Sequence, residues 1–254
     1  MTYHNPVLLQ EAIAFLAVKP GKKYIDCTLG GGGHAAEIIR RGGQVLGLDQ
    51  DPEALLACPE LRGLTKVQTN FIHLTEVATK YGFNPVSGIF LDLGVSEHQF
   101  ATGSRGFSFQ QDGSLDMRMD PSLPNTAADL VNHLTVKQLS HLFKEYGEIP
   151  PARSLAGKVI ENRPLSTTHQ LARITGKWSQ QAFQALRIAV NDELGALKSV
   201  LPQASGLLEP GGRLVIISFH SLEDRIVKNH FNHLTLKQFV IGPKNAKLRA
   251  YVKN

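Results

Sequence analysis

Four consecutive glycines, at positions 30–33, follow an apolar run in the stretch YIDCTLGGGGH. Glycine adopts a positive φ without steric cost and lets the backbone approach a ligand closely. A P-loop would need Lys followed by Ser or Thr after its last glycine, but His34 and Ala35 stand there instead. The relaxed dinucleotide pattern is met by Gly30, Gly32 and Ala35. The loop could therefore serve a dinucleotide, S-adenosylmethionine, or a turn that binds nothing.

Two aspartates stand where strands are predicted to end. Asp49 closes QVLGLD and could accept hydrogen bonds from the ribose hydroxyls of either cofactor. Asp92 closes GIFLD, at the edge of the sheet where such folds bind ligands. A fixed acceptor there could localise the lone pair of a base's exocyclic amine and aim it at a methyl group. Enzymes of that kind often have Pro-Pro next, whereas Leu93 and Gly94 follow here, so a buried Asp that caps a turn fits this segment equally well.

The two cysteines are poorly placed for covalent catalysis. Methylation of carbon 5 of cytosine needs a Cys nucleophile, but Cys27 lies in the predicted first strand and Cys58 near the end of a predicted helix. The ten histidines form no His-x-x-x-His or Cys/His cluster, so we expect no metal. With no signal peptide, no disulfide framework and no membrane-length apolar run, the sequence indicates a reduced, cytoplasmic protein.

The predicted elements position these residues on an α/β sheet. Strands at 23–29, 44–49, 66–71 and 88–95 alternate with helices at 34–41 and 52–58, which predicts a doubly wound, mostly parallel sheet. Residues 101–124 read as a long functional loop, followed by helices that include one long helix over 179–201. Strand patterns return at 211–220, 237–242 and 247–252. We therefore expect one α/β domain, 1–103 plus 199–254, with a mostly helical insertion, 104–198.

Charge is uneven along the chain. The formal net charge is +5, and from Arg225 onward there are seven Lys or Arg and no Asp or Glu. This asymmetry favours a polyanionic partner, although a solubilising tail would have the same composition.

Several segments together resemble one family, the bacterial small-subunit (16S) ribosomal RNA cytosine-N4 methyltransferases (RsmH, also called MraW). The matching stretches run in the family's order from His4 to Lys228, and the most specific are RGFSFQQDGSLDMRMD and ISFHSLEDRIVK. The resemblance implies a Rossmann-like class I methyltransferase that uses S-adenosylmethionine on a cytidine in the decoding region. Its RNA partner would be free rRNA or the assembling 30S subunit, and the helical insertion would help to recognise it.

The resemblance also implies a set of site residues. Asp92 would be catalytic, and the cofactor would be held by Gly32, Gly33, His34, Asp49, Phe71, Asp92 and Gln99. Candidates for RNA contact are Arg105, Arg118, Arg187, Asn191, His220, Lys247 and Arg249.

Several of these residues admit a simpler interpretation. Gln184, Arg187 and Asn191 form a polar stripe that could be a solvated helix face, and Arg105 and Arg118 could hold their loop together. Phe107 and Phe109 could stack on bases or pin the loop to the core. The chain departs from the family pattern at Glu97, at TGKWSQQA before FQALRI, and at the short GPKNAKLR segment, which affects expected RNA affinity more than cofactor binding.

Two other functions compete with the methyltransferase hypothesis. The glycine loop could bind a dinucleotide in an oxidoreductase, and the trimmed loops could indicate a ribosome-binding assembly factor that has lost catalysis. The sequence does not fix the oligomeric state.

Overall fold

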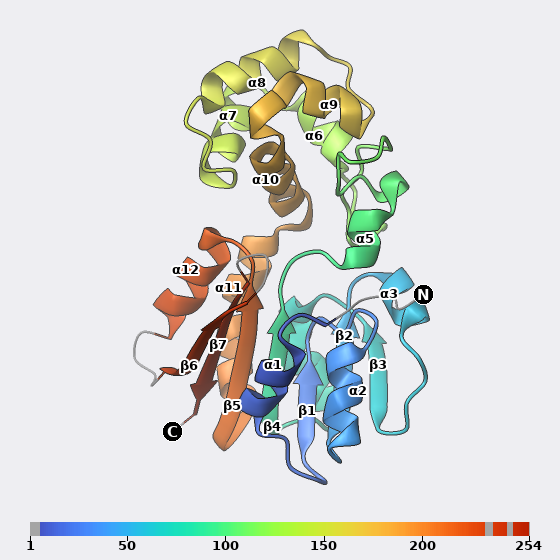
Figure 1. Ribbon diagram of the computed structural model, residues 1–254, viewed down its shortest axis with the longest axis vertical. Helices are drawn as coiled ribbons and strands as arrows, with labels where there is room; N and C mark the ends of the chain where they lie inside the picture. The colour runs from blue at the N-terminus through green and yellow to red at the C-terminus, as the bar shows by residue number, and fades with distance from the viewer. Residues whose placement is uncertain (1–5, 232–235, 243–245, 254) are drawn as a thin grey trace. The chain divides into compact units, whose positions relative to one another are not determined.

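A computed structural model describes residues 6–231, 236–242 and 246–253, and its contacts divide the chain into two compact units (Figure 1). The first unit is Met1–Gly94 with Leu194–Asn254, and the second is Val95–Glu193. Both divisions come earlier than the expected boundaries at 103 and 198. Val95 packs against the core of the second unit, and Glu193 pairs with Arg187 of the same unit. These contacts account for the earlier boundaries.

The first unit is built on a seven-stranded sheet of order β3-β2-β1-β4-β5-β7-β6, in which β7 is antiparallel to both of its neighbours. The strands are β1 (Lys23–Asp26), β2 (Gln44–Asp49), β3 (Leu64–Gln68), β4 (Val86–Asp92), β5 (Leu208–Ser218), β6 (Leu236–Ile241) and β7 (Lys247–Val252). The prediction of a mostly parallel α/β sheet is confirmed.

Alternate strand residues enter two separate cores, as a doubly wound sheet requires. Ile89 and Leu91 of β4 face one core, which also receives apolar residues of α4 (Leu74–Lys80), α11 (Glu193–Leu207) and α12 (Ser221–His230). Phe90, between them, faces the other core, together with residues of α1 (Leu9–Leu16) and α2 (Gly33–Arg40). A short helix, α3 (Pro52–Ala57), follows β2. Among the described residues, no helix is both long and apolar enough to cross a membrane.

The second unit is helical and has its own core, which includes the buried Leu139, Phe143 and Leu186. Its helices are α5 (Glu97–Ala101), α6 (Ala127–His133), α7 (Val136–Glu145), α8 (Ala152–Glu161), α9 (Thr168–Thr175) and α10 (Ser179–Asn191). Thr135 caps α7 as its sequence predicts, since its side chain accepts a hydrogen bond from the Gln138 N–H.

Several predicted elements differ from the structure: the first strand ends at Asp26 and the fourth at Asp92, three residues before their predicted ends. The single helix over 179–201 is two helices, because Asp192 adopts a left-handed conformation (φ 47°) that ends α10 before α11 begins. Asp is one of the few residues that tolerate this region. The third strand ends at Gln68, and Phe71 begins a short 3₁₀ helix, η1 (Phe71–His73), whose first turn is capped by the Asn70 side chain.

Candidate active site

Three aspartates end three neighbouring strands of the sheet. Asp49 ends β2, Asp26 ends β1 and Asp92 ends β4, and these strands lie in the order β2-β1-β4. Because the three strands are parallel, their carboxyl ends meet at one edge of the sheet, where open α/β sheets bind ligands.

The glycine turn is fastened to this edge through Asp49. Its Oδ2 accepts a hydrogen bond from Gly30 N at 2.8 Å, and its Oδ1 accepts one from Asp51 N at 2.9 Å. Gly32 has a φ of 80°, and a Cβ at that position would lie 2.5 Å from the Cys58 sulfur. The turn therefore requires glycine at position 32, and it leaves the backbone without side chains beside Asp49.

Asp26 is a site residue that sequence reasoning missed. It is 1% exposed; its Oδ1 accepts from Thr28 N at 3.1 Å, and its Oδ2 is buried without a hydrogen-bond partner in the described part of the chain. Burial, together with the nearby charge of Asp49, raises the pKa of Asp26 to about 7. An acidic residue that ends a buried strand was the available signal, because such residues are rarely buried without a partner.

Asp92 also retains an unused acceptor. Its backbone N–H donates to Thr28 Oγ1 at 2.7 Å, whereas its Oδ1 is buried and has no hydrogen-bond partner among residues 6–231 and the two later described stretches. Burial raises the pKa of Asp92 well above its usual range, and the charges of Asp26 and Glu223 add to the effect. Burial likewise raises the pKa of Asp49 to about 6. This edge of the sheet therefore holds several carboxyls, and no cation in the described part of the chain balances their negative charge.

The other expected cofactor residues of the first unit lie near the ends of β1 and β3. Gly33 begins α2, and His34 is buried, with its Nε2 3.1 Å from the Val7 carbonyl oxygen and its ring 4.3 Å from that of Phe90. Phe71 follows β3 and packs, partly buried, against the sheet's core. His34 therefore fastens the N-terminal segment to α2, and its role toward a cofactor stays a prediction.

Gln99 belongs to the second unit, where it is buried and caps α5. The side-chain Oε1 of Gln99 accepts a hydrogen bond from Ser96 N at 3.0 Å, and the backbone N–H of Gln99 donates one to Ser96 Oγ at 3.1 Å. The capping box accounts for its amide oxygen without a cofactor.

The arginines expected to contact RNA in the 101–124 loop hold that loop together. Arg118 forms a bidentate pair with Asp116, with both nitrogen–oxygen distances 2.8 Å, and donates to the Pro121 and Leu123 carbonyls. Arg105 donates to the carbonyls of Arg118 and Met119. The structure thus favours the structural interpretation of both.

The same loop is anchored to the helical core by two aromatic rings. Phe107 is buried, and the Phe109 ring lies 5.1 Å from that of Phe183 in an edge-on contact. Of the two interpretations left open for these rings, pinning to the core is the one that the contacts support.

The polar stripe on α10 is not a solvated face. Asn191 is 5% exposed; it accepts from Met119 N at 2.7 Å and donates to the Met117 carbonyl at 2.8 Å. Arg187 forms a bidentate pair with Glu193, at 2.8 and 2.9 Å. Both residues are committed to the fold, so their expected RNA contacts are not supported.

Of the expected RNA residues near the C-terminus, Lys247 and Arg249 are paired, whereas the buried Nε2 of His220 makes no hydrogen bond within the described residues. Arg249 Nε lies 2.7 Å from Asp224 Oδ1, and Lys247 Nζ lies 3.3 Å from Asp224 Oδ2. His220 caps α12, with its Nδ1 3.4 Å from Glu223 N. Asp224 lies one residue before the stretch from Arg225 onward, so that stretch's lack of acidic residues did not reveal the partner of Arg249 and Lys247. Lys244, which belongs to that stretch, lies outside the described residues.

Neither cysteine is activated. Both are free and buried, and burial raises the pKa of each thiol, that of Cys27 strongly. The described residues contain no group of three or more His, Cys, Asp or Glu that could hold a metal ion.

This edge fits a cationic, hydroxyl-bearing ligand. The glycine turn offers open backbone, and buried oxygens of Asp26 and Asp92 await hydrogen-bond donors or positive charge. The Asp49 carboxylate accepts backbone hydrogen bonds, among them those from Gly30 and Asp51, and its remaining lone pairs can accept from a hydroxyl.

Comparison with known proteins agrees with this geometry. The MraW methylase family model matches residues 1–252. The ribosomal RNA small subunit methyltransferase H of Symbiobacterium thermophilum is 48% identical over 252 residues, covering 90% of this chain and 79% of its own. The protein of the same name from Geobacter sulfurreducens is 46% identical, covering 91% and 82%. The crystal structure of a Clostridium thermocellum protein, 14% identical over 98% of each chain, superposes with a TM-score of 0.51, which concerns the fold alone.

Proposed function

The chain belongs to the MraW methylase family, and on that premise we propose that it is an S-adenosylmethionine-dependent methyltransferase of small-subunit ribosomal RNA. More specifically, we propose that the acceptor is N4 of a cytidine in the decoding region. The observation that carries the proposal is the row of Asp49, Asp26 and Asp92 at the carboxyl edge of the sheet, with buried acceptor atoms left unpaired.

The residues of the first unit would divide the work as follows. Asp49 would accept hydrogen bonds from ribose hydroxyls, the Gly32–Gly33 backbone would lie beside the amino-acid part, and Phe71 would contact the adenine. When bound, S-adenosylmethionine supplies an electrophilic methyl group. The second unit would recognise the RNA.

Asp92 would position the target amine. The lone pair of a cytosine amine is delocalised into the ring, so the amine is a weak nucleophile. A carboxylate that accepts a hydrogen bond from one amine N–H localises the lone pair and orients it. Such a role needs an acceptor atom that the fold itself does not use, and Oδ1 is such an atom.

Direct transfer to nitrogen needs no covalent intermediate with the protein. The raised thiol pKa values of Cys27 and Cys58 keep both sulfurs protonated and poorly nucleophilic at neutral pH. This disfavours methylation of carbon 5 of cytosine, which requires a thiolate. A dinucleotide-dependent oxidoreductase is set aside because the matching family is one of methylases.

The product nucleoside tests the proposal. Small-subunit rRNA incubated with the protein and labelled S-adenosylmethionine, then digested and chromatographed, should yield labelled N4-methylcytidine. A Cys27→Ser/Cys58→Ser double variant should give the same product at a similar rate. Labelled 5-methylcytidine, or loss of activity in the double variant, would contradict the mechanism. Absence of any transfer to either free rRNA or small subunits would favour an assembly factor without catalysis.

A further inference from the structure

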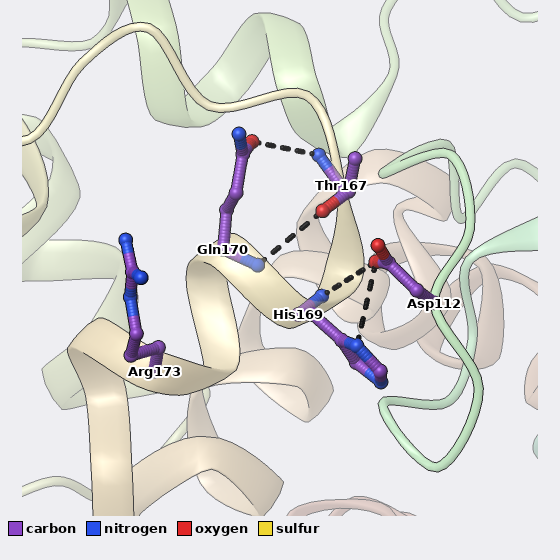
Figure 2. A pocket seen from close by; sticks show the side chains of 5 residues that line it. All are labelled: Asp112, Thr167, His169, Gln170 and Arg173. Atoms are coloured by element: carbon purple, nitrogen blue, oxygen red, sulfur yellow. Dashed lines mark hydrogen bonds and ion pairs between the residues drawn. The ribbon is translucent and has the colours of Figure 1, made fainter.

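A recess of about 350 Å³ lies on the second unit, far along the chain from the aspartates described above. It is lined by polar side chains from the start of α9 and from the 101–124 loop: Asp112, Thr167, His169, Gln170 and Arg173 (Figure 2). Sequence analysis did not single out any of these residues.

Asp112 Oδ1, an acceptor at the recess, is already used by the protein. Asp112 Oδ1 accepts from His169 N at 3.0 Å and from Gly113 N at 3.1 Å, and it also lies 3.9 Å from His169 Nδ1. The hydrogen bonds from His169 N and the Thr167 hydroxyl hold the pKa of Asp112 below its usual range, so it stays ionised and occupied.

The polar groups around the start of α9 also make hydrogen bonds within the protein. Gln170 Oε1 accepts from Ser166 N at 2.8 Å and from Thr167 N at 3.1 Å. Thr167 Oγ1 accepts from Gln170 N at 3.3 Å, which completes a capping box. The helix start is therefore capped internally and offers no unused N–H of its own to a ligand.

The donors of the recess, by contrast, are unused. Arg173 makes no hydrogen bond or ion pair with any residue that the structure describes, and Figure 2 draws none to the other four lining residues. Within the same described stretches, the Gln170 amide nitrogen has no partner either. Residues 169 and 173 are four apart on α9 and 170 and 173 three apart, so these side chains are neighbours on the helix surface.

A recess with the free donors of Arg173 and Gln170, and with Asp112 Oδ1, Gln170 Oε1 and Thr167 Oγ1 already occupied, favours a ligand rich in acceptors. A phosphate group provides such acceptors, and an arginine guanidinium suits it because its planar fork can donate two parallel hydrogen bonds. A second exposed cation, Lys177, follows just after α9, with its ammonium 5.3 Å from the Trp178 ring. Positive charge therefore continues along the chain beyond the recess, which suits a polyanion better than a single small anion.

We propose that this recess holds a phosphodiester group of the RNA substrate, with Arg173 as its principal contact. The proposal rests on the proposed function, since it takes ribosomal RNA as the ligand. It assigns the RNA contact of the helical unit to α9, and not to the arginines of the loop that the sequence favoured.

Binding of a labelled decoding-region rRNA fragment, measured by fluorescence anisotropy over a range of salt concentrations, tests the proposal. Arg173→Glu should weaken binding by about fivefold or more near 0.1 M salt. Arg173→Ala should flatten the slope of log affinity against log salt by about 0.7–0.9, the contribution of one phosphate contact. The matched control is Arg153→Glu, an exposed arginine of α8 that does not line the recess and should change binding little.

Equal effects of Arg173→Glu and Arg153→Glu would overturn the proposal, because they would reflect overall charge alone. A loss confined to assembled subunits, with binding to free RNA unchanged, would also overturn it and indicate a protein partner. The wild-type product assay separates this outcome from failure of the proposed function. If the wild type forms N4-methylcytidine and the two variants behave alike, the recess assignment is wrong and the methyltransferase assignment stands.

Discussion

The carboxyl edge of the sheet and the loop of the helical unit use their polar groups in opposite ways. At the edge, Asp26 Oδ2 and Asp92 Oδ1 are buried without a partner in the described parts of the chain. In the loop, Arg118 binds Asp116 and two carbonyls, and Asn191 bonds to the backbone of Met117 and Met119.

The difference separates residues that await a ligand from residues that maintain the fold. A buried polar atom without a hydrogen bond costs roughly 1–3 kcal/mol. Such an atom persists where a ligand supplies the missing partner. A polar group whose hydrogen-bonding capacity is used within the chain stabilises the fold. Few of its donors or acceptors remain to bind RNA. Substitution of one residue from each group tests this distinction.

The largest effect is expected from Asp92→Ala. Removing the acceptor should lower the rate of methyl transfer by about 100-fold or more, the scale of a lost positioning or general-base group. Stability of the ligand-free protein should not fall, because the Asp92 side chain makes no bond whose loss would be felt. Asp92→Asn, which keeps one acceptor oxygen, should retain more activity. An Asp92→Ala variant that transfers methyl groups at the normal rate would remove Asp92 from the site.

Asp49→Ala should weaken S-adenosylmethionine binding by about 1.5–3 kcal/mol, roughly 10- to 150-fold, through loss of hydrogen bonds to a charged group. Because Asp49 also holds the glycine turn, Asp49→Asn is the matched control; its amide oxygen can still accept from Gly30 N. Calorimetry should show weaker binding in both variants, with the larger loss of thermal stability in the alanine variant. Normal affinity in a folded Asp49→Asn variant would indicate that Asp49 serves the turn alone.

Asn191→Ala should affect stability instead. Loss of the bonds to Met117 and Met119 leaves buried backbone groups unpaired, so the free energy of unfolding should fall by about 1–3 kcal/mol. The single tryptophan, Trp178, belongs to the same unit and reports its unfolding in urea. Asn162→Ala, at an exposed residue that caps the C-terminal end of α8, is the control and should cost less. Unchanged stability with weakened RNA binding would return Asn191 to the RNA-contact group.

The smallest effect is a pH dependence of cofactor binding. Burial raises the pKa of Asp26 to about 7 and that of Asp49 to about 6, so both accept hydrogen bonds best above pH 7 and become protonated as the pH falls through 7 to 6. S-adenosylmethionine should therefore bind up to about tenfold more tightly at pH 8 than at pH 6. Titration calorimetry across this pH range checks the trend. The Asp26→Asn variant should lose the part of the affinity change that occurs near pH 7. A flat affinity profile would mean that neither carboxyl titrates on binding.

In the ligand-free protein, Asp26 and Asp49 make stability fall as the pH rises, which is opposite to the expected trend in cofactor affinity. Their folded pKa values lie above the unfolded values of about 4. Their contribution to stability is therefore complete below pH 4 and is lost as the pH rises through 6 to 7.

Much of the sheet and part of the site could be predicted from the sequence. Continuous apolar runs that end in Asp49 and Asp92, with a glycine-rich turn between strand and helix, define strand ends locally. Asp26 was missed because the strand predicted over 23–29 placed it inside the strand, whereas β1 ends at Asp26 between β2 and β4. The left-handed Asp192 that divides the predicted long helix carried no local signal that distinguished it from a helical aspartate.

The partners of the polar residues expected to contact RNA could not be read from the sequence, because they lie far away along the chain. Asn191 bonds to a residue 74 positions away, and Arg249 pairs with one 25 positions away. Conversely, Arg173 lies in a helix with no feature that marks it, and its lack of a partner within the described ranges is visible only once the neighbouring loop is placed.

A crystal structure of the protein with S-adenosylhomocysteine bound would test the central claim most directly. The account predicts the ribose hydroxyls on the Asp49 carboxylate, the glycine turn along the amino-acid part, and the Asp92 carboxylate facing the sulfur-bearing end with its Oδ1 directed into the site. A ligand bound elsewhere, or bound at this edge with both carboxylates turned away from it, would contradict the account.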